Sequence, residues 1–432
     1  MPINLILGTD DDDHLLGTNR RDLIRAGRGD DVVTPMGDHD TVYGEAGNDT
    51  VFGYFNAQVL YGGDGDDRLV SGNADPASLS RVYGGDGNDQ IAASDLVVHA
   101  FAGAGDDEVL VFFRHGGAVR GGLGTDTLVL NFFAAAPDAR VIALLTGSDA
   151  GVLLGSDHLA LTGFEALNIT TGQADDYIRA GALDDRIDVG AGLNTVLALA
   201  GDDVVTYRTG AQNVLIGGDG TDSLHVIQNL RQGGLVLTVS GTTAVDGHGS
   251  VLTGFERWFA FGGNLADLVQ LGGGQDGFTG YRGDDSCLGM AGADRLAGGA
   301  GDDLLFGGSG SDTLSGGAGS DTLTGGQDGD AFHIGRLDRA GDLIMDFVSG
   351  ADQIVLRSRA LENLVPDGTL SADRFHLDTA SGTAGQFLYR ASDTPGLSEL
   401  VWDANGTAAA GETLIALFWA APDLAAHDIL IL

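Results

Sequence analysis

The sequence predicts an all-β fold, a parallel β-solenoid in which short strands stack as successive coils. From residue 262 to 333, aspartate fills the sixth place and an apolar residue the eighth place of every nonapeptide. Of the 432 residues, 43% are hydrophobic, which is too many for a disordered acidic tail despite the 72 glycines. A unit with one apolar residue can bury it only by stacking on its neighbours, so the period predicts a repeat array.

The charge balance excludes several kinds of partner. The chain has 62 acidic residues against 22 basic ones, a formal charge of −40, and every basic residue is arginine. Nucleic acids and anionic membranes would repel such a chain. The chain would also repel itself in a compact state, which indicates that folding depends on bound cations.

Each place of the repeat G-G-x-G-x-D-x-U-x, with U apolar, has a physical reason. Glycine permits positive φ angles and close backbone approach in a tight turn. A turn that curls its carbonyls inward and ends in aspartate offers the hard oxygen ligands that Ca²⁺ takes. The x-U-x triplet is a short strand whose middle side chain points inward, because side chains alternate across a strand. A flexible linker holds no such register.

Aspartates at the sixth place are the predicted metal ligands. The C-terminal block supplies Asp267, Asp276, Asp285, Asp294, Asp303, Asp312, Asp321 and Asp330. Residues 8 to 70 keep the same register and supply Asp13, Asp22, Asp31, Asp40, Asp49 and Asp67. Gln58 replaces aspartate in the row "GYFNAQVLY", which lacks the turn glycines, so that row is predicted to hold no ion of its own.

Less regular rows connect the two strict blocks. Degraded rows after residue 70 carry Asp89, Asp107 and Asp126. A middle block carries Asp176, Asp185, Asp203 and Asp222, with Asn194 in one aspartate place. An ion needs neighbouring coils in register, so these central sites are the less regular part of the prediction.

The repeat resembles the nonapeptide of the RTX (repeats-in-toxin) calcium-binding proteins. The resemblance implies a parallel β-roll in which two units, 18 residues, make one coil and several Ca²⁺ ions sit between the turns of successive coils. Since each repeat buries one apolar side chain and stacks its carboxylates, we expect the calcium-free chain to be largely unfolded.

Two β-rich inserts interrupt the array and resemble each other, each ending in "LTGFE". Strand alternation in "GFERWFAF" puts Phe255, Arg257, Phe259 and Phe261 on one face and Glu256, Trp258 and Ala260 on the other. These aromatic residues could form a platform for a sugar or seal the interior of the roll, and we favour the second interpretation.

The expected organisation has six blocks. They are an N-terminal β-roll (1–129), a β insert (130–170), a middle repeat block (171–225), a second insert (226–261), a C-terminal β-roll (262–333) and a β cap (334–432). The cap resembles the segment that follows the roll in serralysin-type proteases, and its end, "AAHDILIL", resembles an uncleaved type I secretion signal or is simply a last edge strand. The N-terminus shows no cleavable signal peptide, so export by the type I machinery to the outside or the cell surface is expected.

The sequence shows no catalytic motif. H-E-x-x-H and G-x-S-x-G are absent, and without lysine the chain has no Walker-type loop, Schiff-base residue or acylated lysine of a pore-forming cytolysin. Cys287, the single cysteine, occupies an apolar repeat position and is predicted to be core. The leading hypothesis is a non-enzymatic matrix, surface-layer or adhesion (biofilm) protein that self-associates or contacts a cell surface. The alternative is a protein that binds or modifies extracellular polysaccharide.

Overall fold

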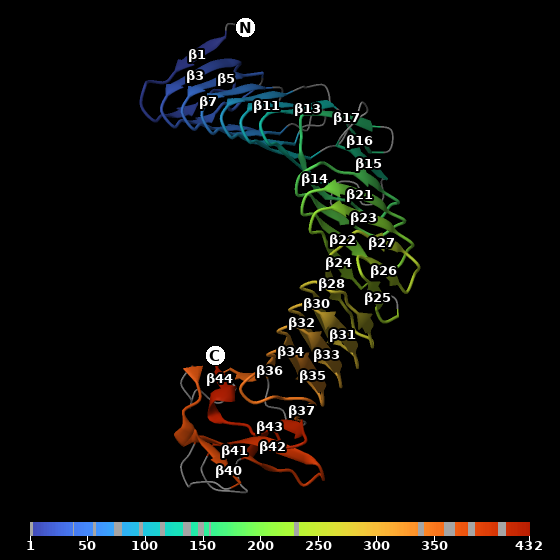
Figure 1. Ribbon diagram of the computed structural model, residues 1–432. Helices are drawn as coiled ribbons and strands as arrows, with labels where there is room; N and C mark the ends of the chain where they lie inside the picture. Colours follow the sequence, from blue (N-terminus) through green and yellow to red (C-terminus); the bar gives the residue numbers. More distant parts are fainter. Residues whose placement is uncertain are drawn as a thin grey trace. The chain divides into compact units, whose positions relative to one another are not determined.

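The chain forms two compact units. The computed structural model describes residues 3–37, 39–54, 58–72, 80–94, 98–112, 117–132, 140–145, 151–154, 157–228, 233–335, 341–357, 368–378, 385–404 and 412–432. Unit 1 comprises Met1–Tyr207 and Ala211–Asp222, and unit 2 comprises Arg208–Gly210 and Ser223–Leu432. Stacked coils of short strands build both units, which confirms the predicted all-β parallel β-solenoid (Figure 1).

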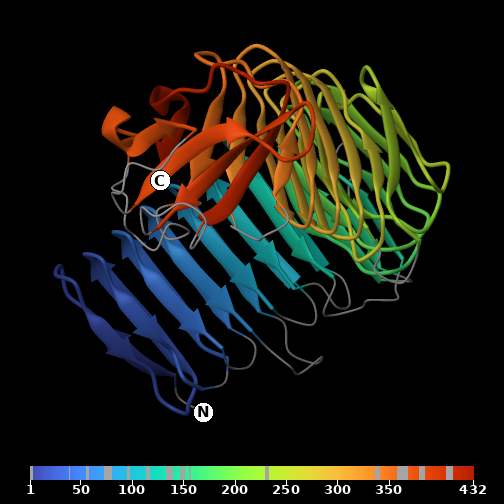
Figure 2. The same ribbon diagram turned by 90° about the horizontal axis from the view of Figure 1, so that it is seen from below.

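Unit 1 consists of two facing sheets, and the chain alternates between them. Sheet A runs in the order β1 (Asn4–Leu7), β3 (Asp22–Arg28), β5 (Thr41–Ala46), β7 (Val59–Asp64), β9 (Arg81–Asp86), β11 (Val98–Ala104), β13 (Gly117–Leu123), β17 (Asp157–Thr162), β16 (Gly151–Leu154), β15 (Val141–Leu144), β19 (Tyr177–Arg179), β21 (Thr195–Ala200) and β23 (Val214–Asp219). Sheet B runs β2 (His14–Leu16), β4 (Val32–Thr34), β6 (Thr50–Gly53), β8 (Arg68–Ser71), β10 (Gln90–Ala93), β12 (Glu108–Val111), β14 (Thr127–Asn131), β18 (Ala166–Thr170), β20 (Arg186–Val189) and β22 (Val204–Arg208). Figure 2 shows the first strands of this unit lying side by side.

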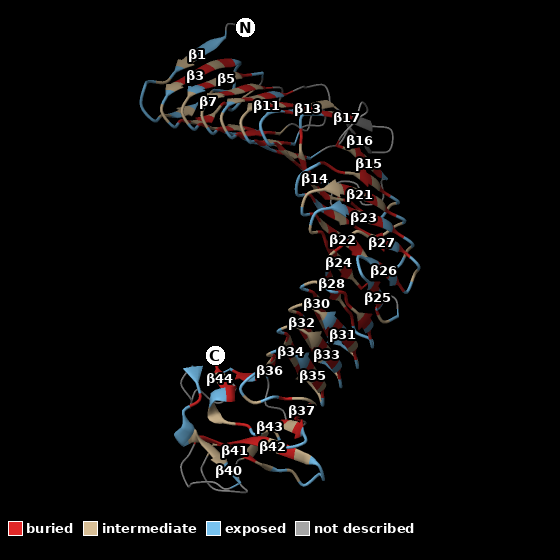
Figure 3. Cartoon of the chain, in the orientation of Figure 1, coloured by how far each residue is buried: buried red, intermediate tan, exposed pale blue. Residues whose placement is uncertain are grey.

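The register keeps one coil 18 residues long in the regular part, as in Asn4↔Asp22 and Leu23↔Thr41. This register stacks the apolar place of each repeat on the same place of the next coil. The inner column of sheet A, for example, holds Ile24, Val42, Leu60, Val82, Ala100 and Val119, all buried. Figure 3 shows these buried positions in red along the interior of the strands.

The first insert enlarges one sheet only. Its strands β15, β16 and β17 form an antiparallel meander that lies within sheet A between β13 and β19. In sheet B, β14 pairs directly with β18. The predicted hairpin-like insert is therefore an elaboration of one face of the coil.

Unit 2 repeats this architecture. Its sheet B runs β24 (Ser223–Ile227), β28 (Arg257–Phe261), β30 (Gly277–Arg282), β32 (Arg295–Ala300), β34 (Thr313–Ala318), β36 (Ala331–Ile334), β38 (Gln353–Leu356), β44 (Ile429–Ile431) and β39 (Gly368–Thr369). Its sheet A runs β27 (Val251–Thr253), β26 (Thr243–Asp246), β25 (Val236–Ser240), β29 (Leu268–Gln270), β31 (Ser286–Ala291), β33 (Leu304–Ser309), β35 (Thr322–Gln327), β37 (Asp342–Ile344), β43 (Glu412–Trp419), β42 (Leu397–Asp403), β41 (Gln386–Ala391) and β40 (Phe375–Leu377).

The C-terminal segment closes both sheets of the roll. β43 continues sheet A beside β37, and β44 continues sheet B beside β38. The ring of Phe347 contacts those of Phe332 in the last repeat and Phe418 in the cap, at centroid distances of 6.1 and 5.6 Å. Two single-turn 3₁₀ helices, η2 (Ala372–Arg374) and η3 (Ala426–Asp428), also belong to this segment.

The aromatic residues of the second insert seal the interior. Trp258 is fully buried, so it offers no surface to a sugar. Phe255 is buried as well, which corrects its expected place on the face of Arg257, Phe259 and Phe261. The reason is that β28 begins only at Arg257, and Phe255 lies in the preceding turn with its ring edge-on to Trp258.

Two further features agree with the sequence. Cys287 is buried in the inner column of sheet A. In the part of the chain that the structure describes, no helix is long and apolar enough to cross a membrane.

Candidate metal centre

The aspartates of the repeat form columns along the turns of the roll. In unit 1 one edge carries Asp31, Asp49, Asp67, Asp89 and Asp107, each in the same place of successive coils. Twenty of the 21 predicted ligands are buried, and Asp13, in the first coil, is half-buried because no coil covers it. The degraded rows at Asp89, Asp107 and Asp126 thus lie in register with the regular ones.

One oxygen of each aspartate builds a ladder between coils. The Oδ1 atom of Asp67 accepts a hydrogen bond from the backbone N–H of Asp49 in the coil before, at 2.8 Å. The same bond recurs down both units at 2.7–3.1 Å, into Asp31, Asp40, Asp49, Asp67, Asp89, Asp107, Asp126, Asp203, Asp222, Asp285, Asp294, Asp303, Asp312, Asp321 and Asp330. In the same way, Asp176, Asp185, Asp267 and Asp276 accept from Val141, Leu167, Leu235 and Trp258.

The other carboxylate oxygen is buried without a hydrogen-bond partner among the described residues. This holds for Oδ2 of Asp31, Asp49, Asp67, Asp89, Asp107, Asp126, Asp176, Asp203, Asp285, Asp294, Asp303, Asp312 and Asp330. Burial of an ionised oxygen without a partner costs several kcal/mol, so a fold that repeats this arrangement needs a compensating cation or proton.

The protonation equilibria report the same strain. Burial raises the pKa of Asp294 to about 8 and those of Asp67, Asp285 and Asp330 to about 7, against an ordinary value of 3.8. Neighbouring aspartates add to the increase, and the hydrogen bond from the preceding coil opposes it. A bound divalent cation would reverse these shifts, because it favours the ionised form.

The turn glycines leave room only for oxygen atoms. A Cβ atom on Gly62 would lie 2.0 Å from Oδ2 of Asp67. Gly65 has φ +126°, and its Cβ would lie 2.3 Å from the carbonyl oxygen of Gly47 in the preceding coil. Carbonyl and carboxylate oxygens therefore line the same turns, which is the donor set of Ca²⁺. No group of three or more His, Cys, Asp or Glu side chains that could hold a metal occurs among the described residues, so carbonyls must supply most ligands.

A second, exposed ladder runs beside the buried one and was not predicted. At the fifth place of the repeat, Oδ1 of Asp30 accepts from the N–H of Asn48, and Oδ1 of Asn48 accepts from the N–H of Asp66. It continues through Asn88 and Asp106 to the N–H of Thr125. The recurring doublets Gly-Asp-Asp and Gly-Asn-Asp in the sequence could have revealed it.

The columns also continue where the nine-residue period stops. The N–H of Asp126 donates to Oε2 of Glu165, the glutamate of the first "GFE", at 3.0 Å. Glu256 of the second "GFE" lies level with Asp222, because Ser223 pairs with Arg257. Beyond the last repeat, Asp342 and Asp352 accept from the N–H groups of Asp321 and Asp330.

Neutral residues occupy a few places of the columns. Gln58 is buried with both side-chain polar atoms unpartnered, and the next coil offers Ser80 at 3.4 Å from its N–H. Asn194 accepts from the N–H of Asp176, and Asn213 accepts from that of Asn194. The ladder bond needs only an acceptor, whereas attraction of a cation needs charge, so these places keep the fold with less negative charge.

Comparison with known proteins supports this assignment. The family model of the RTX calcium-binding nonapeptide repeat (4 copies) matches residues 7–42, 36–57, 43–75, 80–96, 169–206, 261–296 and 297–332. Among solved structures, the crystal structure of extracellular lipase LipA from Serratia marcescens is similar to 63% of this chain, with 17% identity and a TM-score of 0.15. The similarity spans 41% of that lipase chain. None of the curated proteins matches the chain.

Proposed function

Because the chain carries RTX calcium-binding nonapeptide repeats, we propose that it is secreted, folds on extracellular calcium and acts as a non-enzymatic matrix, surface-layer or adhesion component. The observation that carries the proposal is the column of buried Oδ2 atoms without hydrogen-bond partners among the described residues. The residues fit the ion, since Ca²⁺ takes carboxylate and carbonyl oxygens together.

Calcium couples folding to location. Extracellular modules bind Ca²⁺ in the range of about 10⁻⁴–10⁻³ M, far above the range of cytosolic sensors. A chain with a formal charge of −40 and stacked carboxylates stays unfolded where calcium is scarce, and binding of the ion drives folding by mass action. An unfolded chain is the form that a secretion channel can thread.

The C-terminal strand agrees with this order of events. Ile429 and Ile431 are buried in β44, between β38 and β39. A terminal apolar segment that serves as an export signal is accessible in the unfolded chain, and folding on calcium then incorporates it into the roll.

A calcium titration of the purified full-length chain tests the proposal. We expect little β-structure by far-ultraviolet circular dichroism in chelator and a cooperative gain of β-signal at millimolar Ca²⁺, with Mg²⁺ much less effective because it requires near-octahedral geometry. A chain that shows full β-structure in chelator contradicts calcium-dependent folding. Light scattering on the calcium-loaded protein then tests the matrix role, for which calcium-dependent self-association is expected.

A further inference from the structure

A groove of about 340 Å³ crosses the outer face of sheet B in unit 2. It spans the strands β30, β32, β34, β36 and β38, on the side opposite the apolar column of the roll. None of the residues that line it is acidic, although the chain has 62 acidic residues. The groove is therefore a local exception to the charge of the molecule.

Two arginines give the groove its charge. Neither Arg295 nor Arg357 makes an ion pair or a side-chain hydrogen bond within the described part of the chain, whereas Arg390 pairs with Glu399 and Glu412. Arg295 is exposed on the outer face of β32, and Arg357 directly follows β38. Unpaired guanidinium groups that face one groove are available to bind carboxylates in the two-bond geometry that arginine favours.

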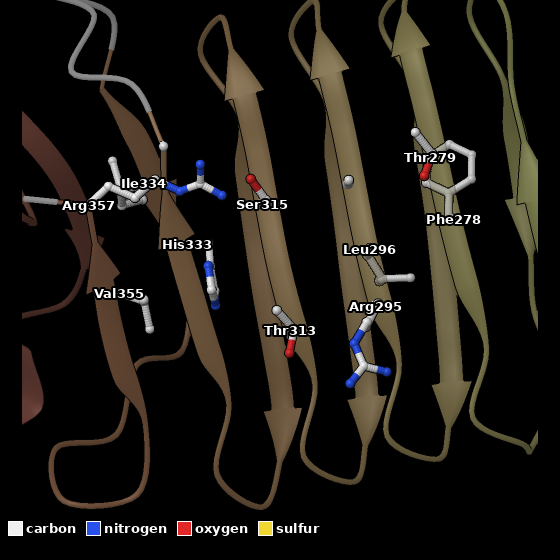
Figure 4. Close-up of a pocket in the computed structure, with 12 residues that line it drawn as sticks. Phe278, Thr279, Arg295, Leu296, Thr313, Ser315, His333, Ile334, Val355 and Arg357 are labelled. Carbon is white, nitrogen blue, oxygen red and sulfur yellow. The ribbon is translucent and has the colours of Figure 1, made fainter. Parts of the chain in front are cut away.

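Polar side chains line the floor between the arginines. Thr279, Thr313 and Ser315 offer hydroxyl groups, and His333 adds a half-buried imidazole. Burial and the charge of Arg357 lower the pKa of His333, so the ring is neutral at pH 7 and both donates and accepts hydrogen bonds. Figure 4 shows Arg295, Thr313 and His333 in a row across three neighbouring strands, with the guanidinium of Arg357 directed toward Ser315.

The spacing of the charges selects an extended ligand. Strands in a sheet lie about 4.8 Å apart, so three steps from β32 to β38 separate the two arginine backbones by about 14 Å. A single small anion cannot contact both guanidinium groups over that length. A chain with carboxylates at intervals and hydroxyls between them matches the order of arginine, hydroxyl and arginine along the groove.

We propose that this groove binds an acidic polysaccharide, a polymer of uronate sugars, with its carboxylates on Arg295 and Arg357 and its hydroxyls on Thr313, Ser315 and His333. The inference extends the proposed function, since it requires the calcium-loaded roll but holds whether or not the protein self-assembles. It also moves polysaccharide recognition from the buried Trp258 to a different surface.

Short oligouronates and the calcium-loaded full chain provide the test, with affinity measured by isothermal titration calorimetry. We expect Arg295→Gln and Arg357→Gln each to weaken binding roughly tenfold or more, because each removes a charged hydrogen-bonding group. Arg282→Gln is the matched control: it makes the same charge change on an exposed residue of β30 outside the groove. Ser315→Phe should block the trough without changing its charge, and Thr324→Phe on the outer face of sheet A is its control.

Both arms are run at the same calcium concentration, so any calcium bridging between carboxylates cancels in the comparison. Equal affinity of the wild type and both arginine variants would overturn the proposal, as would equal binding of a neutral oligosaccharide. Equal binding of an oligoglutamate of similar length would show an acidic-peptide site instead. Unchanged circular dichroism of every variant in calcium separates failure of the groove from failure of calcium-dependent folding.

Discussion

At the residue scale, each ladder aspartate has two separate tasks. One oxygen holds the neighbouring coil through a backbone N–H, and the other lies buried without a partner among the described residues, as in Asp294. Asn194 performs the first task in the same columns with no charge, so the fold itself does not require the carboxylate. The charge serves the cation.

Substitution of Asp294 by asparagine separates these tasks. Asp294→Asn keeps the acceptor for the N–H of Asp276 and removes the charge, so we expect the calcium-loaded fold to persist while the calcium midpoint of folding rises several-fold. Asp393→Asn, at an exposed turn of the cap, makes the same change in net charge and should leave the midpoint unchanged. Equal midpoints for the two variants in a calcium titration followed by circular dichroism would exclude Asp294 as a ligand.

The sequence predicts residues that obey a local period and misses those that depend on register. Asp294 is found because aspartate recurs every nine residues. Glu165 is missed because it lies 39 residues from its partner Asp126, and only the pairing of β14 with β18 brings the two together. Asp352 is missed because it lies 22 residues beyond Asp330, after the period has ended.

At the element scale, the register of sheet A in unit 1 also builds a stack of aromatic rings on its outer face. Tyr43, Tyr61, Tyr83 and Phe101 lie on consecutive strands with centroid distances of 4.7, 4.8 and 5.1 Å. Arg25 lies over the ring of Tyr43 and Arg120 over that of Phe101, at 5.3 and 5.4 Å, so cations cover the two end faces. Because the ring faces cover one another, the stack stabilises the sheet and offers no flat platform to a sugar.

Removal of one ring from the middle should be felt on both sides. Tyr61→Ala breaks two ring contacts, each worth about 0.5–1.5 kcal/mol beyond area burial, so we expect the calcium-loaded protein to lose about 1–3 kcal/mol of unfolding free energy. Tyr61→Phe keeps the ring and should cost little. Urea unfolding at saturating calcium measures both, and equal loss in the two variants would show that the hydroxyl rather than the stack matters.

The spacing of these rings shows why element-scale features are partly hidden in sequence. Tyr43 and Tyr61 are 18 residues apart, as the coil length predicts, but Tyr83 follows Tyr61 after 22 residues. The longer coil keeps its strands in register and places the additional residues in the connection before Ser80. A fixed-period search cannot place such an insertion, and so the rows after residue 70 look degraded although their strands pair regularly.

At the scale of the whole molecule, the buried carboxylates make the fold a balance between calcium, protons and charge repulsion. The chain has a formal charge of −40, and its ladder aspartates lie at the sheet edges without arginine partners among the printed ion pairs of the described residues. Calcium and protons are the two cations that can offset them. Each should therefore substitute for the other in stabilising the roll.

Mild acid should accordingly promote folding without calcium. Burial raises the folded-state pKa of Asp294 to about 8 and of Asp285 and Asp330 to about 7, above the ordinary 3.8 that the unfolded chain retains. The folded state therefore binds more protons than the unfolded state between these values, and its stability falls as the pH rises through them. That contribution is complete below about pH 4 and lost by about pH 8.

We therefore expect the chain in chelator to gain β-signal as the pH is lowered from 8 to 5, and the calcium-loaded chain to change little over the same range. Light scattering at each pH controls for association near the isoelectric point of about 4.1. A calcium-free chain that is equally unfolded at pH 8 and pH 5, or more folded at pH 8, would contradict the assignment of the buried carboxylates as the groups that oppose folding. Calcium would then stabilise the roll mainly through its backbone carbonyls.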